Sequence, residues 1–167
     1  MLELLTVMII MVILATLSLS GFQYLRDRSE RANCVSNLQN LYAAGHAYLL
    51  DHNNVWPQIP ASTISTPAYA QAWIAAFSPY QLGPVNWICP TTQRGLGSPN
   101  YQDPKKARVD YIADPFSPKP YQAFHWPTQP WFAENGAGHG QGPLLLLTSG
   151  QVLSLQDTTQ ITSQPTP

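Results

Sequence analysis

The sequence predicts an α+β protein in which one long N-terminal helix packs on a small, loop-rich head with antiparallel β structure. Three observations predict this class. No proline precedes Pro57, the apolar residues ahead of it recur at helical spacing, and two apolar runs near the C-terminus flank a glycine turn. Sixteen prolines and ten glycines among 167 residues indicate irregular structure elsewhere.

The N-terminal segment Met1–Leu19 is apolar almost throughout and carries a single formal charge, at Glu3. Its length approaches the roughly 20 residues that cross a bilayer as a helix. A signal peptide needs a basic beginning and a small-x-small cleavage site, whereas this segment begins uncharged and runs on into helix-compatible sequence. A buried core helix is the other alternative, but helices apolar on every side seldom lie at the edge of a small domain. We therefore expect a retained membrane anchor.

Glu3 is the unusual residue of this segment. An ionised carboxylate among leucines is costly in hydrocarbon. Two explanations stay open: Glu3 has a dedicated cationic partner, or it is an interfacial acid that the helix dipole favours at the N-terminus.

The helix is expected to continue beyond the anchor as an amphipathic half. One face carries apolar residues three and four apart: Cys34 or Val35, Leu38, Leu41, Tyr42, Gly45, Tyr48 and Leu49. Asp51, Asn53 and Asn54 are expected to end it. At about 1.5 Å per residue, the whole helix would be about 75 Å long.

The head is expected to contain a short helix at Tyr69–Phe77 and a short apolar strand or turn at Trp87–Pro90. The segment Thr91–Pro130 reads as long loops with one strand near Val109–Ile112. The run GPLLLLTSGQVLSL predicts a hairpin that turns at Thr148, Ser149 and Gly150. The tryptophans of the head are expected to serve packing: Trp73, Trp87, Trp126 and Trp131.

The two cysteines, Cys34 and Cys89, would form one disulfide in an oxidising compartment. The alternative is two unrelated buried thiols. Neither cysteine has a second Cys or a His at zinc-ligand spacing, which argues against a structural zinc site. A bridge would tie the long helix to the middle of the chain.

No motif for catalysis or metal binding is evident. His46, His52 and His125 lack a metal-ligand pattern, and HExxH, GxSxG and phosphate-binding glycine loops are missing from the sequence. The carboxylates of the head are expected to lie scattered among loops: Asp103, Asp110, Asp114 and Glu134. A formal net charge of −1 gives no footprint for nucleic acid. We expect no enzyme activity.

The run LELLTVMIIMVILATL resembles the mature N-terminus of type IV pilins and type II secretion pseudopilins. The resemblance implies that Glu3 pairs with the terminal amine of a neighbouring subunit while helices bundle in a filament. In that family a prepilin peptidase removes a short basic leader, so this enzyme is an expected partner if a leader lies upstream of Met1.

Two further segments are similar to a group of pilin-like proteins. In CVSNLQNLYAAGHAYLLDHNNVWP a Cys-x-x-Asn-Leu opening leads to a Trp-Pro exit, and the later Cys-Pro at Cys89 supports pairing with Cys34. The group carries a His, nine residues, then Asp-Gly. Here His139 keeps the spacing to Gly150, but Ser149 replaces the aspartate. We expect His139, Ser149 and Gly150 to be structural, with Gly150 taking positive φ and Ser149 bonding locally.

The resemblance implies a pilin-like fold and a structural subunit of a pseudopilus or pilus-like filament. The expected parts are a transmembrane or filament-core helix (1–20), its amphipathic continuation (21–56), a loop-rich β head (57–157) and a polar tail (158–167). Expected partners are further copies of this chain, minor pilins, the assembly machinery and the bacterial cytoplasmic membrane, with the head on the periplasmic or outer side. No cofactor is expected; calcium, which some pseudopilins bind in such loops, stays open. The alternative function is a single-span envelope enzyme or binding module that uses the His139 loop.

Overall fold

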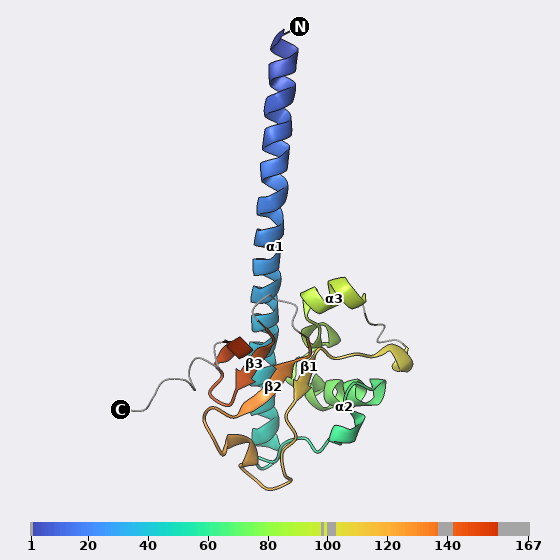
Figure 1. Cartoon of the computed structure of the whole chain (residues 1–167). Helices are drawn as coiled ribbons and strands as arrows, with labels where there is room; N and C mark the ends of the chain where they lie inside the picture. The colour runs from blue at the N-terminus through green and yellow to red at the C-terminus, as the bar shows by residue number, and fades with distance from the viewer. Residues whose placement is uncertain (1, 98, 100–102, 137–141, 157–167) are drawn as a thin grey trace, which may run out of the picture.

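A computed structural model describes residues 2–97, 99, 103–136 and 142–156. It confirms the α+β class, with one long N-terminal helix and a small four-stranded antiparallel sheet. Figure 1 shows the N-terminal half of the helix projecting away from a head that packs against its C-terminal half.

The helix α1 spans Leu2–Asp51, 50 residues in all. At about 1.5 Å per residue it is about 75 Å long, as predicted. It ends where predicted, because Asn53 and Asn54 take left-handed backbone angles, with φ of 53° and 60°. Asparagine tolerates this conformation better than most residues. The Asn54 amide donates to the carbonyl of Leu49 at 2.7 Å, which satisfies one of the last helical acceptors.

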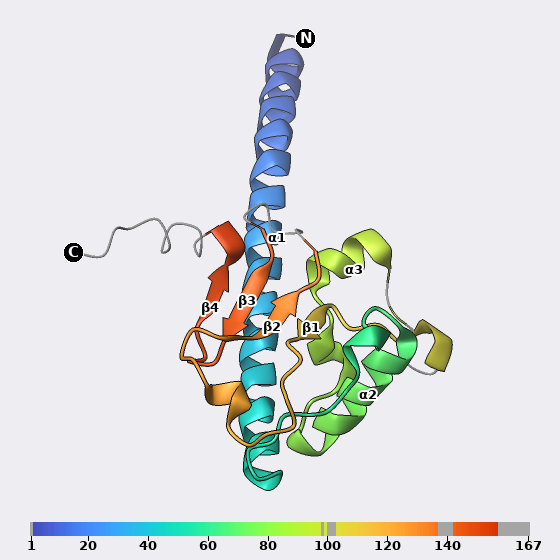
Figure 2. The ribbon, with the colours of Figure 1, turned by 60° about the horizontal axis from the view of Figure 1, so that its bottom comes forward.

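The two halves of α1 have different surroundings. The C-terminal half packs on the head through residues of the predicted apolar face: Cys34, Leu38, Leu41 and Leu49 are buried, as is Ala44, which the prediction did not include. The apolar side chains from Leu4 to Leu14 are exposed instead. Figures 1 and 2 agree that no other element of the described chain lies beside this part of α1.

The sheet has the order β1-β2-β3-β4 and is antiparallel throughout. Its strands are β1 (Tyr111–Ala113), β2 (Pro130–Glu134), β3 (Leu144–Leu147) and β4 (Val152–Ser154). β3 and β4 form the predicted hairpin. β1 confirms the single strand expected near Val109–Ile112, whereas β2 was not predicted. A register shift between Pro130 and Phe132 interrupts the pairing of β2 with β3.

Two helices flank the sheet on the β1 side (Figure 2). The helix α2 spans Pro67–Phe77 and confirms the predicted one, although it starts two residues earlier. Thr66 caps it, since its side chain accepts a hydrogen bond from the amide of Tyr69 at 3.2 Å. Proline at the first helical position is compatible with this start, because its missing N–H would have no helical partner there.

The strand or turn expected at Trp87–Pro90 is corrected by the structure. Trp87 ends a 3₁₀ helix, and Cys89 is the N-cap of the helix α3, Pro90–Leu96, inside a segment expected to be loop. The apolar run there reflects burial of Trp87, Ile88 and Cys89, not strand pairing. Short 3₁₀ helices complete the head, at Ala61–Thr63, Ser78–Tyr80, Pro84–Trp87, Pro104–Lys106 and Gln122–Phe124.

Aromatic rings fill the core between α1, α2 and the sheet. Trp56 lies at the centre, with ring centroids 5.1 Å from Trp131 and 5.8 Å from Trp73. Such pairs contribute about 0.5–1.5 kcal/mol each beyond their buried area. Trp73, Trp87 and Trp131 confirm the packing role predicted for the tryptophans, but Trp126 is exposed.

Candidate functional site

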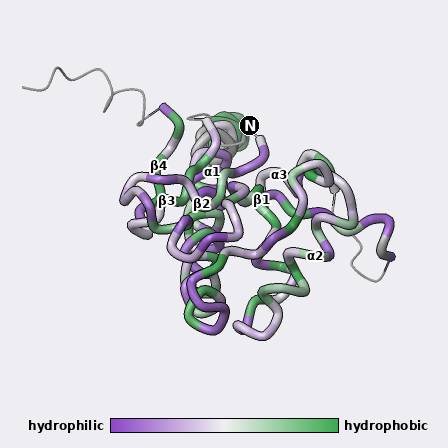
Figure 3. The backbone as a smooth tube through the Cα atoms, turned by 90° about the horizontal axis from the view of Figure 1, so that it is seen from below, coloured by the Kyte–Doolittle hydropathy of each residue, from purple (hydrophilic) through white to green (hydrophobic). Residues whose placement is uncertain are grey.

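The N-terminal half of α1 is the most unusual surface of the molecule. Its ten apolar side chains from Leu4 to Leu14 are each between 51% and 73% exposed. Leu4, Leu5, Met8, Ile9, Val12 and Ile13 form a shallow apolar groove along it. Figure 3, coloured by hydropathy, shows green turns of α1 gathered behind the N label. A contiguous apolar surface of this kind marks a site of interaction with protein or lipid.

Glu3 lies in the first turn of this exposed helix. Ion pairs within the described residues do not include it. The first basic side chain after Glu3 is that of Arg26, which is about 35 Å further along the helix axis. A cation that neutralises Glu3 must therefore come from a terminus or from another molecule. Among the described residues, no helix meets the length and hydropathy that a membrane crossing requires.

Charged residues fasten α3 to α1 at the level where α1 leaves the head. Arg94 of α3 contacts Glu30 and lies 3.0 Å from Asp27. Glu30 also accepts hydrogen bonds from Arg26 at 2.9 Å and from the Thr91 hydroxyl at 3.1 Å. Burial alone would raise the pKa of Glu30, but the hydrogen bonds from Arg94, Arg26 and Thr91 outweigh it and lower the pKa. These contacts join α3 to α1 where the helix leaves the head.

The predicted disulfide is present: Cys34 of α1 is bridged to Cys89, with Cα atoms 5.3 Å apart. Both cysteines are fully buried. The bridge ties the long helix to the middle of the chain, as expected, and it does so at the N-cap of α3. The side-chain amide of Asn37, one turn further along α1, donates to the carbonyl of Ile88 at 2.9 Å and supports the same junction.

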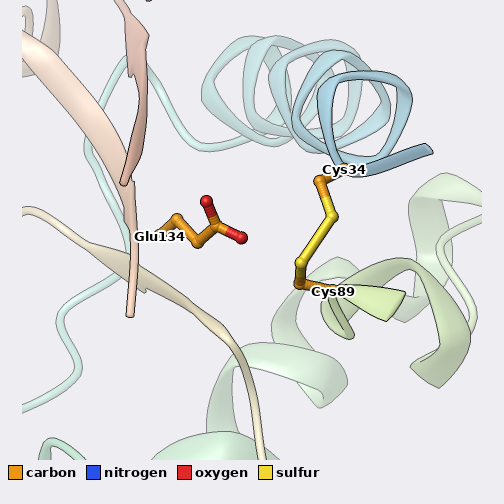
Figure 4. Close-up of side chains that lie close together, drawn as sticks. All are labelled: Cys34, Cys89 and Glu134. Carbon is orange, nitrogen blue, oxygen red and sulfur yellow. A yellow bond between two sulfur atoms is a disulfide. The ribbon is translucent and has the colours of Figure 1, made fainter. Parts of the chain in front are cut away.

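Two buried carboxylates lie beside this bridge, which corrects the expectation that the acids of the head are scattered among loops. Asp110 accepts a hydrogen bond from the amide of Cys89 at 3.0 Å and pairs with Arg108 at 2.8 Å. Glu134 ends β2 opposite Tyr111 of β1. Figure 4 shows the Glu134 carboxylate pointing from the strand toward the Cys34–Cys89 bridge. No local spacing in the sequence connects residues 34, 89 and 134.

The other two of these four carboxylates, Asp103 and Asp114, have roles unrelated to the bridge. Asp103 caps a 3₁₀ turn, where its side chain accepts a hydrogen bond from the amide of Lys105 at 3.0 Å. The amide of Asp114 donates to the carbonyl of Trp131 at 2.9 Å, just past β1. Calcium requires six to eight oxygen ligands. Among the described residues, one group of possible metal ligands lies close together: Cys34, Cys89 and Glu134. This group contains a single carboxylate, which is too few oxygen ligands for calcium.

The C-terminal motif is described in part, because His139 lies outside the described residues. Ser149 and Gly150 form the turn between β3 and β4, where Gly150 has the predicted positive φ of 81°. The Ser149 hydroxyl accepts a hydrogen bond from the amide of Gln151, two residues further on, at 3.4 Å. The turn lies against α1, since the Tyr42 hydroxyl donates to the carbonyl of Thr148 at 3.2 Å.

Gly150 is expected to tolerate no side chain. A Cβ at this position would lie 2.9 Å from the ring of Tyr42, and left-handed backbone costs an L-residue about 1–2 kcal/mol. Gly150→Ala is therefore expected to lower the free energy of unfolding by about 2 kcal/mol or more. Urea denaturation measures this. The matched control is Gly95→Ala in α3, where a Cβ meets open space and the change should be neutral or stabilising. Equal effects of the two substitutions would contradict the prediction.

His46 lies on the buried side of α1 among aromatic rings. Its ring centroid is 4.5 Å from Tyr42, 5.0 Å from Trp131 and 5.3 Å from Phe124. Burial lowers the pKa of His46 below its ordinary value of 6.5, because the packed rings disfavour the charged form. The arrangement suits a neutral packing residue.

The free energy of unfolding is therefore expected to fall as the pH drops below 6.5. In that range the unfolded chain binds a proton at His46 that the folded chain does not, until the pH passes the lowered folded pKa. Urea denaturation at about pH 7.5 and about pH 5.5 measures the change. His46→Phe keeps the aromatic packing without titrating, so it should reduce the pH dependence. If the pH dependence of the free energy of unfolding is unchanged in His46→Phe, other titrating groups cause it.

The chain matches no protein-family model, no curated protein and no solved structure. The resemblance of its N-terminal helix to pilins therefore stays a prediction from the sequence.

Proposed function

We propose that this chain is a structural subunit of a pilin-like or pseudopilin-like filament, in which copies of α1 pack side by side and the heads face outward. One observation carries the proposal. The ten apolar side chains from Leu4 to Leu14 are exposed on a helix end that projects beyond the head. Nothing in the described head covers them.

Burial of these side chains against a partner would release a large amount of free energy. Complete burial of one such side chain is worth about 1.5–3 kcal/mol, so burial of the exposed parts of ten would contribute on the order of 10 kcal/mol. Neighbouring copies of α1 supply a surface of the same chemistry. Because each copy has an identical helix, side-by-side packing can repeat along a polymer.

The same helix suits a lipid environment before assembly. As part of the proposal, the apolar half of α1 is held in the bacterial cytoplasmic membrane and the head lies on its periplasmic side. The Cys34–Cys89 disulfide supports this side, since disulfides persist in oxidising compartments. A chain with 10% charged residues and net charge −1 also suits an envelope structural protein better than a binder of nucleic acid.

Site-directed crosslinking in cells that express the full chain tests the proposal. Met8→Cys places a thiol on the projecting helix, at a side chain 70% exposed, and should give crosslinked oligomers in sheared filament fractions. Val85→Cys, at a side chain 75% exposed on the head, is the matched control and should crosslink less. Crosslinks at Val85 without crosslinks at Met8 would indicate head-to-head association and contradict helix packing.

A further inference from the structure

Aromatic and then basic side chains follow the apolar half of α1. The side chains of Phe22 and Tyr24 are each 66% exposed. Arg26, Arg28 and Arg31 come next along the helix. Tyrosine is enriched where a membrane meets water, and basic side chains are attracted to anionic headgroups there. The order of these residues is therefore that of a helix leaving a bilayer.

Their positions along α1 match the thickness of a bilayer. The hydrocarbon core is about 30 Å thick, which a helix crosses in about 20 residues. If Glu3 lies at one boundary of this core, the other boundary lies near Gln23. The headgroup layer, which adds about 5–8 Å on each side, then reaches the level of Arg28. Because Cα–Cβ bonds tilt toward the N-terminus of a helix, the side chains of Arg28 and Arg31 start out toward this layer.

These two arginines lack the carboxylate partners that the neighbouring cations have. The junction of α1 with α3 pairs its own arginines with Asp27 and Glu30. Ion pairs of the described residues do not include Arg28 or Arg31. Arg28 is exposed, whereas Arg31 is half-buried and its Nε is buried without a hydrogen-bond partner in the described chain. A cation that is partly removed from water gains more from an anion than a fully exposed one does.

Arg28 and Arg31 are also neighbours on the surface of α1. Residues three apart in a helix lie side by side, so one ligand can contact both. Each guanidinium presents N–H donors in a planar fork that fits phosphate oxygens. In Figure 1 the head begins near this level of α1, so the pair lies at the end of the head that faces the apolar half.

We propose that Arg28 and Arg31 bind the headgroup phosphate of an anionic phospholipid where α1 leaves the head. The inference rests on the membrane location given under the proposed function, and it names the lipid class that the head contacts. The phosphate accepts hydrogen bonds from both guanidinium groups. The acyl chains of the same lipid lie along the exposed apolar side chains of α1. Inorganic phosphate offers the same oxygens but lacks these chains.

The expected affinity follows from the number of arginines. A basic side chain at an anionic membrane surface contributes about fivefold to the affinity. Loss of one arginine should therefore weaken binding about fivefold, and loss of both about 25-fold. Added salt should weaken binding by the wild type, because it screens charges near the surface.

The test uses the full chain in nonionic detergent, titrated with short-chain phosphatidylglycerol that carries a fluorescent acyl chain. Fluorescence anisotropy gives the Kd, and phosphatidylcholine with the same chains and label is the control lipid. The wild type should bind phosphatidylglycerol more tightly. Arg28→Gln should weaken this binding about fivefold, and Arg28→Gln with Arg31→Gln about 25-fold. Lys105→Gln with Lys106→Gln removes two exposed cations from a 3₁₀ helix of the head and should bind as the wild type does.

Four results would overturn the proposal. They are equal affinity for the two lipids, unchanged affinity in the double arginine variant, an equal loss in the double lysine variant, and displacement of the lipid by an equal concentration of inorganic phosphate. The last result would assign the arginines to free phosphate. Near-ultraviolet circular dichroism checks that each variant is folded. If the double arginine variant unfolds, Arg28→Gln decides the matter, because it changes an exposed side chain.

Failure of this inference is distinguishable from failure of the filament proposal. Lipid binding by the dispersed chain does not require assembly, and crosslinking through Met8→Cys does not require the arginines. Normal crosslinking with no preference for phosphatidylglycerol would reject the lipid site alone. A clear lipid preference without crosslinking at Met8 would reject the filament and leave the lipid site.

Discussion

Glu3→Leu is expected to abolish filament assembly while the head stays folded. In the proposed filament the Glu3 carboxylate lies among apolar helices and is met by a cation, for which the terminal amine of a neighbouring copy is the candidate. Removal of one member of a buried ion pair leaves the other charge without its partner, which costs about 3–5 kcal/mol. This cost recurs at every subunit, so assembly fails before folding does.

The measurement is the yield of sheared filaments against the total membrane-held protein. Glu3→Asp retains the charge and is the matched control, so it should assemble at least in part. The Cys34–Cys89 bridge should be intact in both variants, because it lies about 46 Å along α1 from Glu3. Normal filament yield from Glu3→Leu would show that the carboxylate does not set the register of the helices, and would leave it as an interfacial acid.

Cys34→Ser is expected to lower the free energy of unfolding by about 4 kcal/mol. The bridge closes a loop with a sequence separation of 55 residues, and in the chain-entropy model a loop of that length contributes about 4 kcal/mol. A buried serine hydroxyl and a buried thiol of Cys89 replace the bridge, which adds a smaller cost if the hydroxyl finds no partner. This loss is a large fraction of the stability of a small domain.

Urea denaturation of the full chain in detergent, without reductant, measures the change. The control is the double variant Cys34→Ser with Cys89→Ser. The single variant and the double variant both lack the bridge. The second substitution should therefore lower the free energy of unfolding far less than the first. A loss near zero in Cys34→Ser would mean that the packing of α1 alone holds the head, and that the bridge adds little.

The elements predicted correctly are those with local causes. α1 follows from a long run without proline, its end follows from two asparagines that accept left-handed angles, and its buried face follows from the helical period. The β3–β4 hairpin follows from Gly150 between two apolar runs. The cysteine pairing was predictable because the chain has two cysteines.

The sequence also predicted that the C-terminal half of α1 packs on the head and that its apolar N-terminal half does not. The loop-rich middle of the chain could not be predicted as well. α3 begins at a proline after Cys89 with little periodicity, so nothing local distinguished it from a turn. β2 is short and begins with a proline, which is a weak strand signal.

By itself the sequence determined the long helix, the hairpin and the disulfide. The helical period and the turn residues are local signals, and two cysteines allow a single pairing. Only the tertiary structure decided that β2 pairs with both β1 and β3 and that its last residue, Glu134, faces the Cys34–Cys89 bridge. Those relations join segments up to 100 residues apart, from Cys34 to Glu134. Packing of the shared aromatic core sets them, and no local pattern in a single sequence encodes which distant segments will meet.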